Sequence, residues 1–586
     1  MDGSIDWLCL ARFDDEAVFA RLLDAEKGGS WQIEPAEPYR VHQRYRDRTN
    51  LLDTVFNTDS GVVIVTDFMP VHDEDLRQHG RAHAEPRIVR LVECVAGEVK
   101  MRYAFDPRPD FARSDAVPHV EGNRLHCDSD TLHICVICSG VEPQTRGTFT
   151  LTTGASVAFG LRSAQRGRCP DATWSVERAH QLLRNTQVTW WRWISAMRYD
   201  GPYQQFVWRS GLVLKMLTYA PTGAIIAAPT TSLPEWIGGD RNWDYRFTWL
   251  RDASLTLFAL FQLGMKSEAE AFYHWLTHRH LAQGKNRRVP NLFDVSGHAH
   301  TDEQTLDHLE GYRKSRPVRI GNAAADQLQL DVYGEVLDSA YLYARFGGAI
   351  TPELWTELRT VVELAIDRWR EPDSSIWEVR SQRQHYTYSK IMCWVAVDRG
   401  LRLAERFGLA HDSERWKAAR REIHREVTGA GYSKDRQSFV QILGGNALDA
   451  ALLRMGQVRF VPDRDPRLAS TVRAIADNLS SGALVRRYAL NESEDGLQAD
   501  EGAFLLCSFW LADALAHLGE LEEAQRVFER LLTFASPLGL YAEEIDARTG
   551  ELLGNYPQAF THLALIGAAV NIERARHRAI AVHGLR

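Results

Sequence analysis

The first 170 residues alternate between hydrophobic and polar positions over short runs, the period expected of half-buried β-strands. Leu51–Val71 is the clearest case, because two alternating runs flank the turn-forming residues 57–61, which predicts a hairpin. Further strand-like runs follow at short spacing: Ser4–Leu10, Pro86–Val95, Val99–Phe105, Arg124–His126, Leu132–Ser139 and Gly147–Leu161. Short strands separated by Gly, Asp and Pro are typical of an antiparallel β-sandwich, which we expect over residues 1–170.

From about residue 171 the hydrophobic positions recur at helical spacing instead. Thr173–Met197 carries one apolar face, which predicts a linker helix within residues 171–202. Helix-like runs then follow one another through residues 203–586, which indicates an α/α toroid with an inner and an outer ring of helices. The loops at one end of the inner ring would build the site. Lys285–Arg319 is the longest irregular stretch, and loops of that length in a compact domain are usually functional.

Composition narrows the classes of function. The chain has 586 residues, 45% of them hydrophobic and 25% charged, as in an ordinary globular protein. The net charge is −8 without a basic block, which argues against nucleic acid or an anionic membrane surface as a partner. We also expect no transmembrane helix and no signal peptide, and a few native residues before the first one given. Large helical barrels often pair through their outer helices, which makes a homodimer a candidate assembly.

The cysteines and histidines favour neither a metal nor a cofactor. Cys135 and Cys138 form a CxxC inside an apolar run, but no second pair accompanies them, so we expect two buried thiols rather than a zinc site. No HExxH, GxSxG or phosphate-binding glycine loop occurs in the sequence. Scattered cysteines without a secretion signal are typical of a protein of the reducing cytoplasm.

Aromatic rings and charged groups are concentrated in the stretch Gly238–Asp252. It contains Trp243, Tyr245, Phe247 and Trp249 beside Asp240, Asp244, Arg251 and Asp252. The flat apolar face of a sugar ring stacks on an aromatic ring, and its hydroxyls need paired donors and acceptors, which Arg and Asp supply. The alternative is a helix start with a few exposed charges.

Hydrolysis of a glycosidic bond needs two carboxyl groups, one to give a proton to the leaving oxygen and one to act on water or on the sugar. Glu378 is the first candidate, because it lies in a loop beside Trp377, whose apolar ring would line the site and raise the pKa of the acid. The pair Glu543-Glu544, in a loop between two predicted helices, supplies the second. Solvent-exposed loop charge is the alternative for each of these acids.

Asp500 and Glu501 are a third pair of acids, but they precede a strongly amphipathic run. A helix N-cap at Asp500, followed by an acid favoured by the helix dipole, explains them better than catalysis does.

Several motifs together resemble glycoside hydrolase family 15. Phe247-Thr-Trp-Leu-Arg-Asp252 is similar to the Tyr-Thr-Trp-x-Arg-Asp segment of glucoamylases, and Ile376-Trp-Glu378 is similar to their Leu-Trp-Glu. Long segments resemble the trehalase-like branch of bacteria and archaea: Asp2–Cys9, Gly223–Glu235, Arg316–Asn322, Gln329–Glu335 and Leu553–Phe560. The resemblance covers almost the whole chain.

The resemblance implies an N-terminal β-sandwich, a linker and an (α/α)6 barrel that hydrolyses an α-glucoside with inversion. By position, Glu378 matches the general acid and Glu543 the general base, while Glu544 stands where the family has Gln. Matches to residues that bind the sugar are Tyr245, Trp249, Arg251, Asp252 and Arg487.

The substrate has more than one candidate. Trehalase is the first expectation, because the motifs are nearest that branch. An exo-α-glucosidase of glucoamylase or glucodextranase type, acting on malto- or isomaltooligosaccharides, is the alternative. A carbohydrate-binding protein that has lost catalysis is a third, and the joint presence of Glu378, Glu543, Arg251 and Asp252 argues against it.

Overall fold

The computed structural model describes residues 2–71, 86–163, 174–277, 288–299, 302–493, 495–497 and 500–584. They form two compact units. The first consists of Met1–Met197 with the short segments Tyr219–Pro221 and Leu306–Lys314, and the second comprises the remaining residues up to Arg586. The predicted boundary between residues 170 and 171 lies outside the described residues, and so do parts of the predicted loop Lys285–Arg319.

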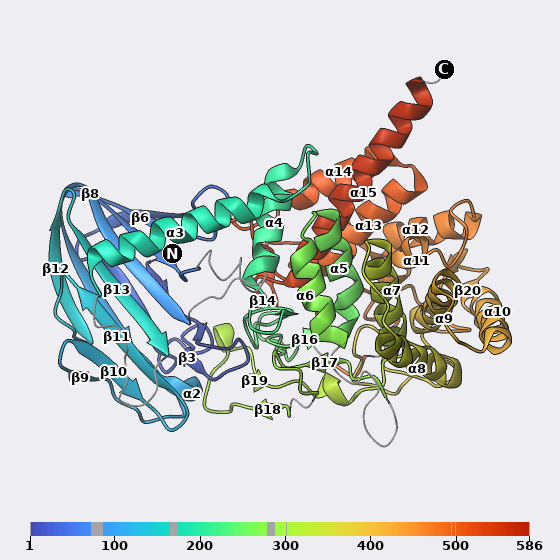
Figure 1. The fold of residues 1–586 in the computed structure, drawn as a ribbon, viewed down its shortest axis with the longest axis horizontal. Coiled ribbons are helices and arrows are strands. Elements are labelled where there is room, and N and C mark those ends of the chain that lie inside the picture. The colour runs from blue at the N-terminus through green and yellow to red at the C-terminus, as the bar shows by residue number, and fades with distance from the viewer. Residues whose placement is uncertain are drawn as a thin grey trace. The chain divides into compact units, whose positions relative to one another are not determined.

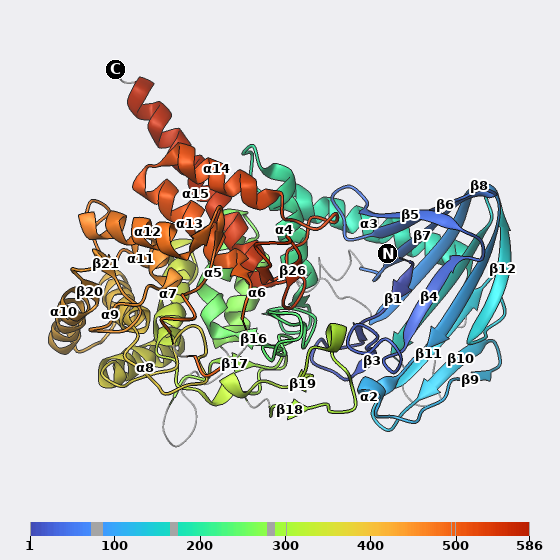
Figure 2. The ribbon, with the colours of Figure 1, turned by 180° about the vertical axis from the view of Figure 1, so that it is seen from behind.

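The first unit is an antiparallel sheet with the strand order β5-β6-β7-β8-β13-β11-β10-β9, and β4 and β12 join it along β8 (Figure 2). Its strands are β1 Ser4–Ile5, β4 Ser30–Pro35, β5 Tyr39–Tyr45, β6 Leu52–Thr58, β7 Gly61–Phe68, β8 Arg87–Asp106, β9 His119–Glu121, β10 Arg124–Asp128, β11 His133–Ser139, β12 Arg146–Thr152 and β13 Ser156–Ser163. The predicted hairpin is confirmed as β6 and β7. Side chains from both branches, such as Trp31, Val63 and Phe159, share one hydrophobic core, so the sheet forms a sandwich.

One long strand replaces two predicted ones. Pro86–Val95 and Val99–Phe105 belong to the single strand β8, whose first half pairs with β7 and β13 and whose second half pairs with β4 and β12. Gly97 lies at the change of partners with φ 80, and a Cβ there would lie 2.0 Å from the carbonyl oxygen of Ser60. A glycine that interrupts an alternating run suggests a strand end, but here it lets the strand bend and continue.

The predicted linker helix is α3, Val176–Ser195, and it lies along the sheet of the first unit (Figure 1). The hydroxyl of Ser175 caps its N-terminus by accepting a hydrogen bond from the N–H of Arg178. His180 places Nε2 2.9 Å from the carboxylate of Glu93 in β8. Apolar residues of α3 such as Leu183 are buried, and the helix contacts β8 and β13, so its apolar face covers the sheet.

The two cysteines of the CxxC lie on β11, and they differ. Cys135 is disulfide-bonded and Cys138 is a free thiol. The prediction of two buried thiols is therefore wrong for Cys135, and for Cys138 the thiol is confirmed but is half-buried. Sequence spacing within one strand could not reveal this, because a disulfide depends on which segment the fold brings beside the strand.

The second unit contains a ring of inner helices. The ring runs through α5, α7, α9, the short pair η4 and α11, α13 and α15, and α15 contacts α5 again. Their bounds are α5 Ala253–Gln262, α7 Asp331–Arg345, α9 Thr387–Phe407, η4 Ala450–Arg454, α11 Met455–Val458, α13 Leu505–Leu518 and α15 Ala559–Gly584. Most residues of α7, α9 and α13 are buried, as expected for helices covered on all sides.

Outer helices cover this ring, each following or preceding an inner one. They are α4 Gln204–Met216, α6 Lys266–Thr277, α8 Pro352–Arg368, α10 Ser413–Ala430, α12 Pro466–Leu479 and α14 Leu521–Leu532. They bury one stripe and expose the other, and they contact the inner helices beside them. The two layers form the expected (α/α)6 barrel. None of the helices in the described part of the chain combines the length and the apolar character needed to cross a membrane.

Candidate active site

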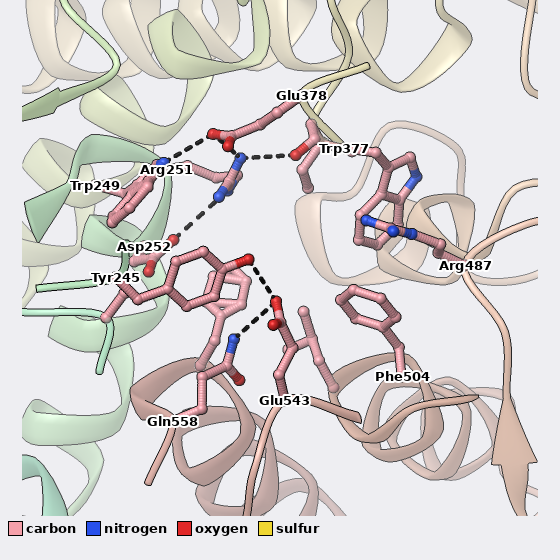
Figure 3. A pocket seen from close by; sticks show the side chains of 14 residues that line it. Tyr245, Trp249, Arg251, Asp252, Trp377, Glu378, Arg487, Phe504, Glu543 and Gln558 are labelled. Atoms are coloured by element: carbon pink, nitrogen blue, oxygen red, sulfur yellow. Dashed lines mark hydrogen bonds and ion pairs between the residues drawn. The ribbon is translucent and has the colours of Figure 1, made fainter. Parts of the chain in front are cut away.

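A cavity that opens to solvent, with about 520 Å³ of empty space when its open mouth is included, lies at the N-terminal ends of the inner helices (Figure 3). Segments far apart in the sequence line it: the loop before α5, the loop before α9, the strands before α13 and the start of α15. The lining residues are Ala227, Tyr245, Trp249, Arg251, Asp252, Ile376, Trp377, Glu378, Arg487, Phe504, Leu506, Glu543, Gln558 and Phe560. The residues matched by resemblance to catalysis or sugar binding, together with Trp377, all line this cavity, whereas Glu544 does not, and neither do Asp240, Trp243, Asp244 and Phe247 of the aromatic stretch.

Glu378 is held by one of its two oxygens. Oε1 accepts hydrogen bonds from Trp249 Nε1 at 2.7 Å, Arg251 Nη1 at 3.1 Å and Gln329 Nε2 at 3.2 Å. Arg251 Nη1 also donates to the carbonyl oxygen of Ile376 at 2.6 Å, which fixes the guanidinium to the same loop. Oε2 accepts none of these three hydrogen bonds.

The backbone at Glu378 is strained. Its φ is 58°, a left-handed conformation that residues with a Cβ seldom adopt. Such a conformation costs on the order of 1–3 kcal/mol and persists only where the surroundings impose it. Here the side-chain amide of Gln327 donates to the carbonyl oxygen of Glu378 at 3.1 Å. This bond and the three hydrogen bonds to Glu378 Oε1 hold the residue in that conformation.

Glu543 lies on the other side of the cavity and is 4% exposed. Figure 3 shows Glu378 with Trp249 and Arg251 at one side, and Glu543 with Tyr245 and Gln558 at the other. Oε1 of Glu543 accepts from Tyr245 Oη at 2.7 Å and from Gln558 Nε2 at 3.4 Å. Oε2 has no hydrogen-bond partner among the described residues. This buried oxygen is therefore available to a water molecule.

Aromatic rings and a charge pair complete the cavity. The rings of Tyr245 and Trp249 lie with centroids 5.4 Å apart, and the Arg251 guanidinium lies 5.9 Å from the ring of Phe560. Arg251 Nε is 3.6 Å from Asp252 Oδ1, and burial raises the pKa of Asp252 to about 7 against the opposing effect of Arg251. Rings with fixed donors and acceptors between them match the needs of a sugar.

Arg487 lines the cavity and joins a buried group of charges. It donates from Nη2 to Glu235 Oε2 at 3.0 Å and from Nε to Glu501 Oε2 at 2.9 Å. Glu544 lies in this group, where its Oε2 accepts the N–H of Gly502 at 2.6 Å. Carboxylate oxygens of Glu235, Glu501 and Glu544 lie within 4.8 Å of one another, the spacing of a metal site. Arg487 supplies positive charge there, so these contacts make an ion-pair cluster.

The reading of Asp500 and Glu501 as a helix start needs correction. α13 begins at Leu505, after the short strand Ala503–Phe504 (β24), and Glu501 is fully buried against Arg487. β24 pairs with a strand on each side, and this tertiary pairing keeps Ala503–Phe504 extended despite the local preference for a helix.

Sequence reasoning gave no role to several residues that the site uses: Glu235, Gln327, Gln329, Gln558 and Phe560. Each lies within or beside a segment quoted for its resemblance, which was the available signal.

Two family models and several named proteins match this chain over most of its length. Residues 201–570 match the family model described as glycosyl hydrolases family 15, and residues 1–157 match one described as trehalase-like, N-terminal. A protein named trehalase from Mycolicibacterium smegmatis is 41% identical over 98% of this chain and 89% of its own length. A protein named trehalase from Thermoplasma volcanium is 36% identical over 98% of this chain and 91% of its own length.

A solved bacterial glucoamylase, in complex with acarbose, has a similar fold. Its TM-score is 0.73 at 13% identity, and the match covers 98% of this chain and 91% of that one. The likeness is one of fold, because the identity is low.

Proposed function

The chain belongs to glycosyl hydrolases family 15 and is a glycoside hydrolase, and from this premise we propose that it hydrolyses trehalose to two glucose molecules with inversion. The observation that carries the proposal is that Glu378 and Glu543 line one cavity together with the Arg251–Asp252 pair and aromatic rings. Similarity to proteins named trehalase over 98% of the chain supports the choice of substrate.

In the proposed mechanism the glucose to be transferred to water lies in this cavity. Tyr245, Trp249 and Phe560 provide apolar walls, and Arg251 and Asp252 hold its hydroxyls. Fixing the sugar in this way places its anomeric carbon between the two carboxyl groups, which is how binding lowers the barrier.

Glu378 gives a proton from Oε2 to the glycosidic oxygen as the bond from the anomeric carbon to that oxygen breaks. Glu543 Oε2 takes a proton from a water molecule, whose oxygen bonds to the anomeric carbon from the opposite face. Tyr245 and Gln558 hold Glu543 by Oε1 so that Oε2 points to that water. Exchange with solvent then returns a proton to Glu378 and removes one from Glu543.

The anomeric form of the products tests this mechanism. Inversion of trehalose yields one β-glucose, from the attacked carbon, and one α-glucose, from the leaving sugar, so early NMR spectra should show the two in equal amounts. Two α-glucose molecules would mean retention and would contradict the mechanism. Hydrolysis of maltose, isomaltose or dextran without hydrolysis of trehalose would favour the exo-α-glucosidase, and no hydrolysis of any substrate would favour a binding protein.

The pH dependence of kcat/KM should follow the pKa of Glu543. Burial raises its pKa above the ordinary 4.5, and the Glu235 carboxylate raises it further. A general base acts when deprotonated, so kcat/KM rises as the pH rises through this pKa. Glu235→Gln removes the second cause, and we expect the acidic limb of the kcat/KM profile to move to lower pH.

Profiles of wild type and variant between about pH 4 and pH 9 would show this. Glu363→Gln, which changes an acid paired with the exposed Arg415, is the control and should leave the limb in place. An unchanged limb in Glu235→Gln, or one at higher pH, would contradict the prediction.

The proposal extends to the compartment, for which we infer the cytoplasm. Free thiols are typical of a reducing compartment, and among the described residues Cys94, Cys127, Cys138, Cys393 and Cys507 are free thiols. The disulfide-bonded Cys135 is the exception.

A further inference from the structure

Glu543 and Glu544 are consecutive in sequence, but their side chains lie in different surroundings. Glu543 lines the active-site cavity (Figure 3), whereas Glu544 lies in the group of charges around Arg487 and is 0% exposed. Glu544 begins the short strand β25, Glu544–Ile545, which pairs with β24 and with β26, Leu552–Leu553. Because side chains alternate along an extended chain, the two acids point to opposite sides. Glu544 therefore acts on Glu543 through its charge and through the backbone that they share.

The group around Arg487 has more acids than cations to pair with them. Carboxylate oxygens of Glu235, Glu501 and Glu544 lie within 4.8 Å of one another. Arg487 donates to Glu235 and to Glu501, and Arg241 lies 3.6 Å from Glu501. Glu544 has no ion pair with a cation in the described part of the chain. Its charge would be uncompensated, and burial strongly disfavours such a charge.

The hydrogen bonds of this group also lack a donor. Oε2 of Glu544 accepts the N–H of Gly502 at 2.6 Å. Oε1 of Glu544 and Oε1 of Glu501 are buried, and neither accepts a hydrogen bond from a described residue. Native proteins rarely leave a buried oxygen without a donor. A proton on Glu544 Oε1 would make this oxygen a donor, and the carboxylates of Glu235 and Glu501 beside it supply acceptors.

We propose that Glu544 is kept as the neutral carboxylic acid at neutral pH and is a positioning residue for the base Glu543. This inference rests on the proposed function. Oε2 accepts from Gly502 and the hydroxyl on Oε1 donates into the group, so the acid ties the start of β25 to the segment before β24. The N–H of Leu505 donates to the carbonyl oxygen of Glu543 at 3.1 Å and holds the same backbone. A neutral Glu544 adds no negative charge beside Glu543, which leaves the base free to ionise.

The groups around Glu544 favour this state. The charged and titratable groups that act on it are Glu235, Glu501, Glu543, Arg487 and the thiol of Cys507. Burial raises the pKa of Glu544 well above its ordinary value, the carboxylates of Glu235 and Glu501 raise it further, and Arg487 opposes them. Burial raises the pKa of the Cys507 thiol as well, so this group adds no charge.

Infrared spectroscopy at neutral pH detects the proton directly, because a carboxylic acid and a carboxylate absorb at different frequencies. Glu544→Gln should remove a carboxylic acid C=O band that wild type shows. Glu363→Gln, which changes an acid paired with the exposed Arg415, is the control and should remove none. The proposal would be overturned if Glu544→Gln removed no band. It would also be overturned if elemental analysis found a divalent cation bound one to one in wild type and absent from Glu544→Gln, since a cation would then neutralise the carboxylates.

The acidic limb of the kcat/KM profile provides a second test. A neutral Glu544 does not raise the pKa of Glu543, so Glu544→Gln should leave the limb where wild type has it, whereas Glu235→Gln moves it to lower pH. The amide keeps one donor and one acceptor, so kcat/KM at neutral pH should fall by less than about tenfold. Glu544→Met keeps neither and should lose more. A limb that moves as far in Glu544→Gln as in Glu235→Gln, or equal losses in the Gln and Met variants, would contradict the proposal.

Failure of the proposed function has a different signature. The infrared band does not depend on activity, so it reports the state of Glu544 whatever the substrate is. If wild type cleaved maltose or isomaltose but not trehalose, the choice of trehalose would be wrong, and the profiles would be measured on the sugar that is cleaved. A Glu544→Gln variant that did not fold would count against the neutral acid, because the amide reproduces its size, donor and acceptor.

Discussion

Glu378→Gln is expected to lower kcat on trehalose by about 10³- to 10⁴-fold, because the leaving sugar then departs without a proton. The amide keeps the size of the side chain and can still accept from Trp249 and Arg251, so trehalose should bind with nearly unchanged affinity in calorimetry. On α-glucosyl fluoride the same variant should lose far less, since fluoride leaves readily without a proton.

Glu543→Gln should lower kcat on trehalose by a similar factor. Unlike Glu378→Gln, it should lower kcat on α-glucosyl fluoride by the same factor as on trehalose, because both reactions need the base to act on water. The two substrates therefore separate the roles of the two carboxyl groups. Glu544→Gln provides the comparison next in sequence: Glu544 is fully buried and does not line the active-site cavity, so the loss of activity in this variant should be much smaller. The assignment would be overturned if Glu544→Gln lost more activity than Glu543→Gln. It would also be overturned if Glu543→Gln hydrolysed α-glucosyl fluoride at nearly the wild-type rate.

Arg487→Met should destabilise the protein by about 3–5 kcal/mol near neutral pH, because it leaves buried carboxylates without their cation. Arg487 pairs with both Glu235 and Glu501, which are 2% and 0% exposed. Burial already raises the pKa of Glu235 and of Glu544, and removing the guanidinium takes away a charge that lowers both.

The loss of unfolding free energy in Arg487→Met should grow as the pH rises. A carboxyl group whose pKa is higher in the folded than in the unfolded state favours folding below its unfolded pKa, and this contribution is lost as the pH rises through the folded value. The deficit of Arg487→Met should therefore be larger at about pH 8 than at about pH 5 in urea unfolding. Arg415→Met, which breaks an exposed pair with Glu363 and Asp367, should cost at most about 1 kcal/mol at either pH. Equal deficits of Arg487→Met at both pH values would contradict the account.

Patterns with a short period were readable from the chain alone. Alternation over Leu51–Val71 predicted the hairpin β6–β7, and helical spacing through residues 203–586 predicted the barrel. Both depend on which face of an element is buried, and the order of side chains records that directly. The aromatic and charged stretch Gly238–Asp252 was recognisable for the same reason, since its chemistry lies within a few consecutive residues.

Only the tertiary structure decided which distant groups meet. Glu501 has the local features of a helix start, and its pairing with Arg487 follows from strands that come together across the barrel end. Trp243 is one aromatic among several in the sequence, and only the fold brings Arg319 and Arg380, far along the chain, to its ring. The residue types needed for glycoside hydrolysis were thus set by the sequence, whereas their partners depend on long-range packing that no local pattern encodes.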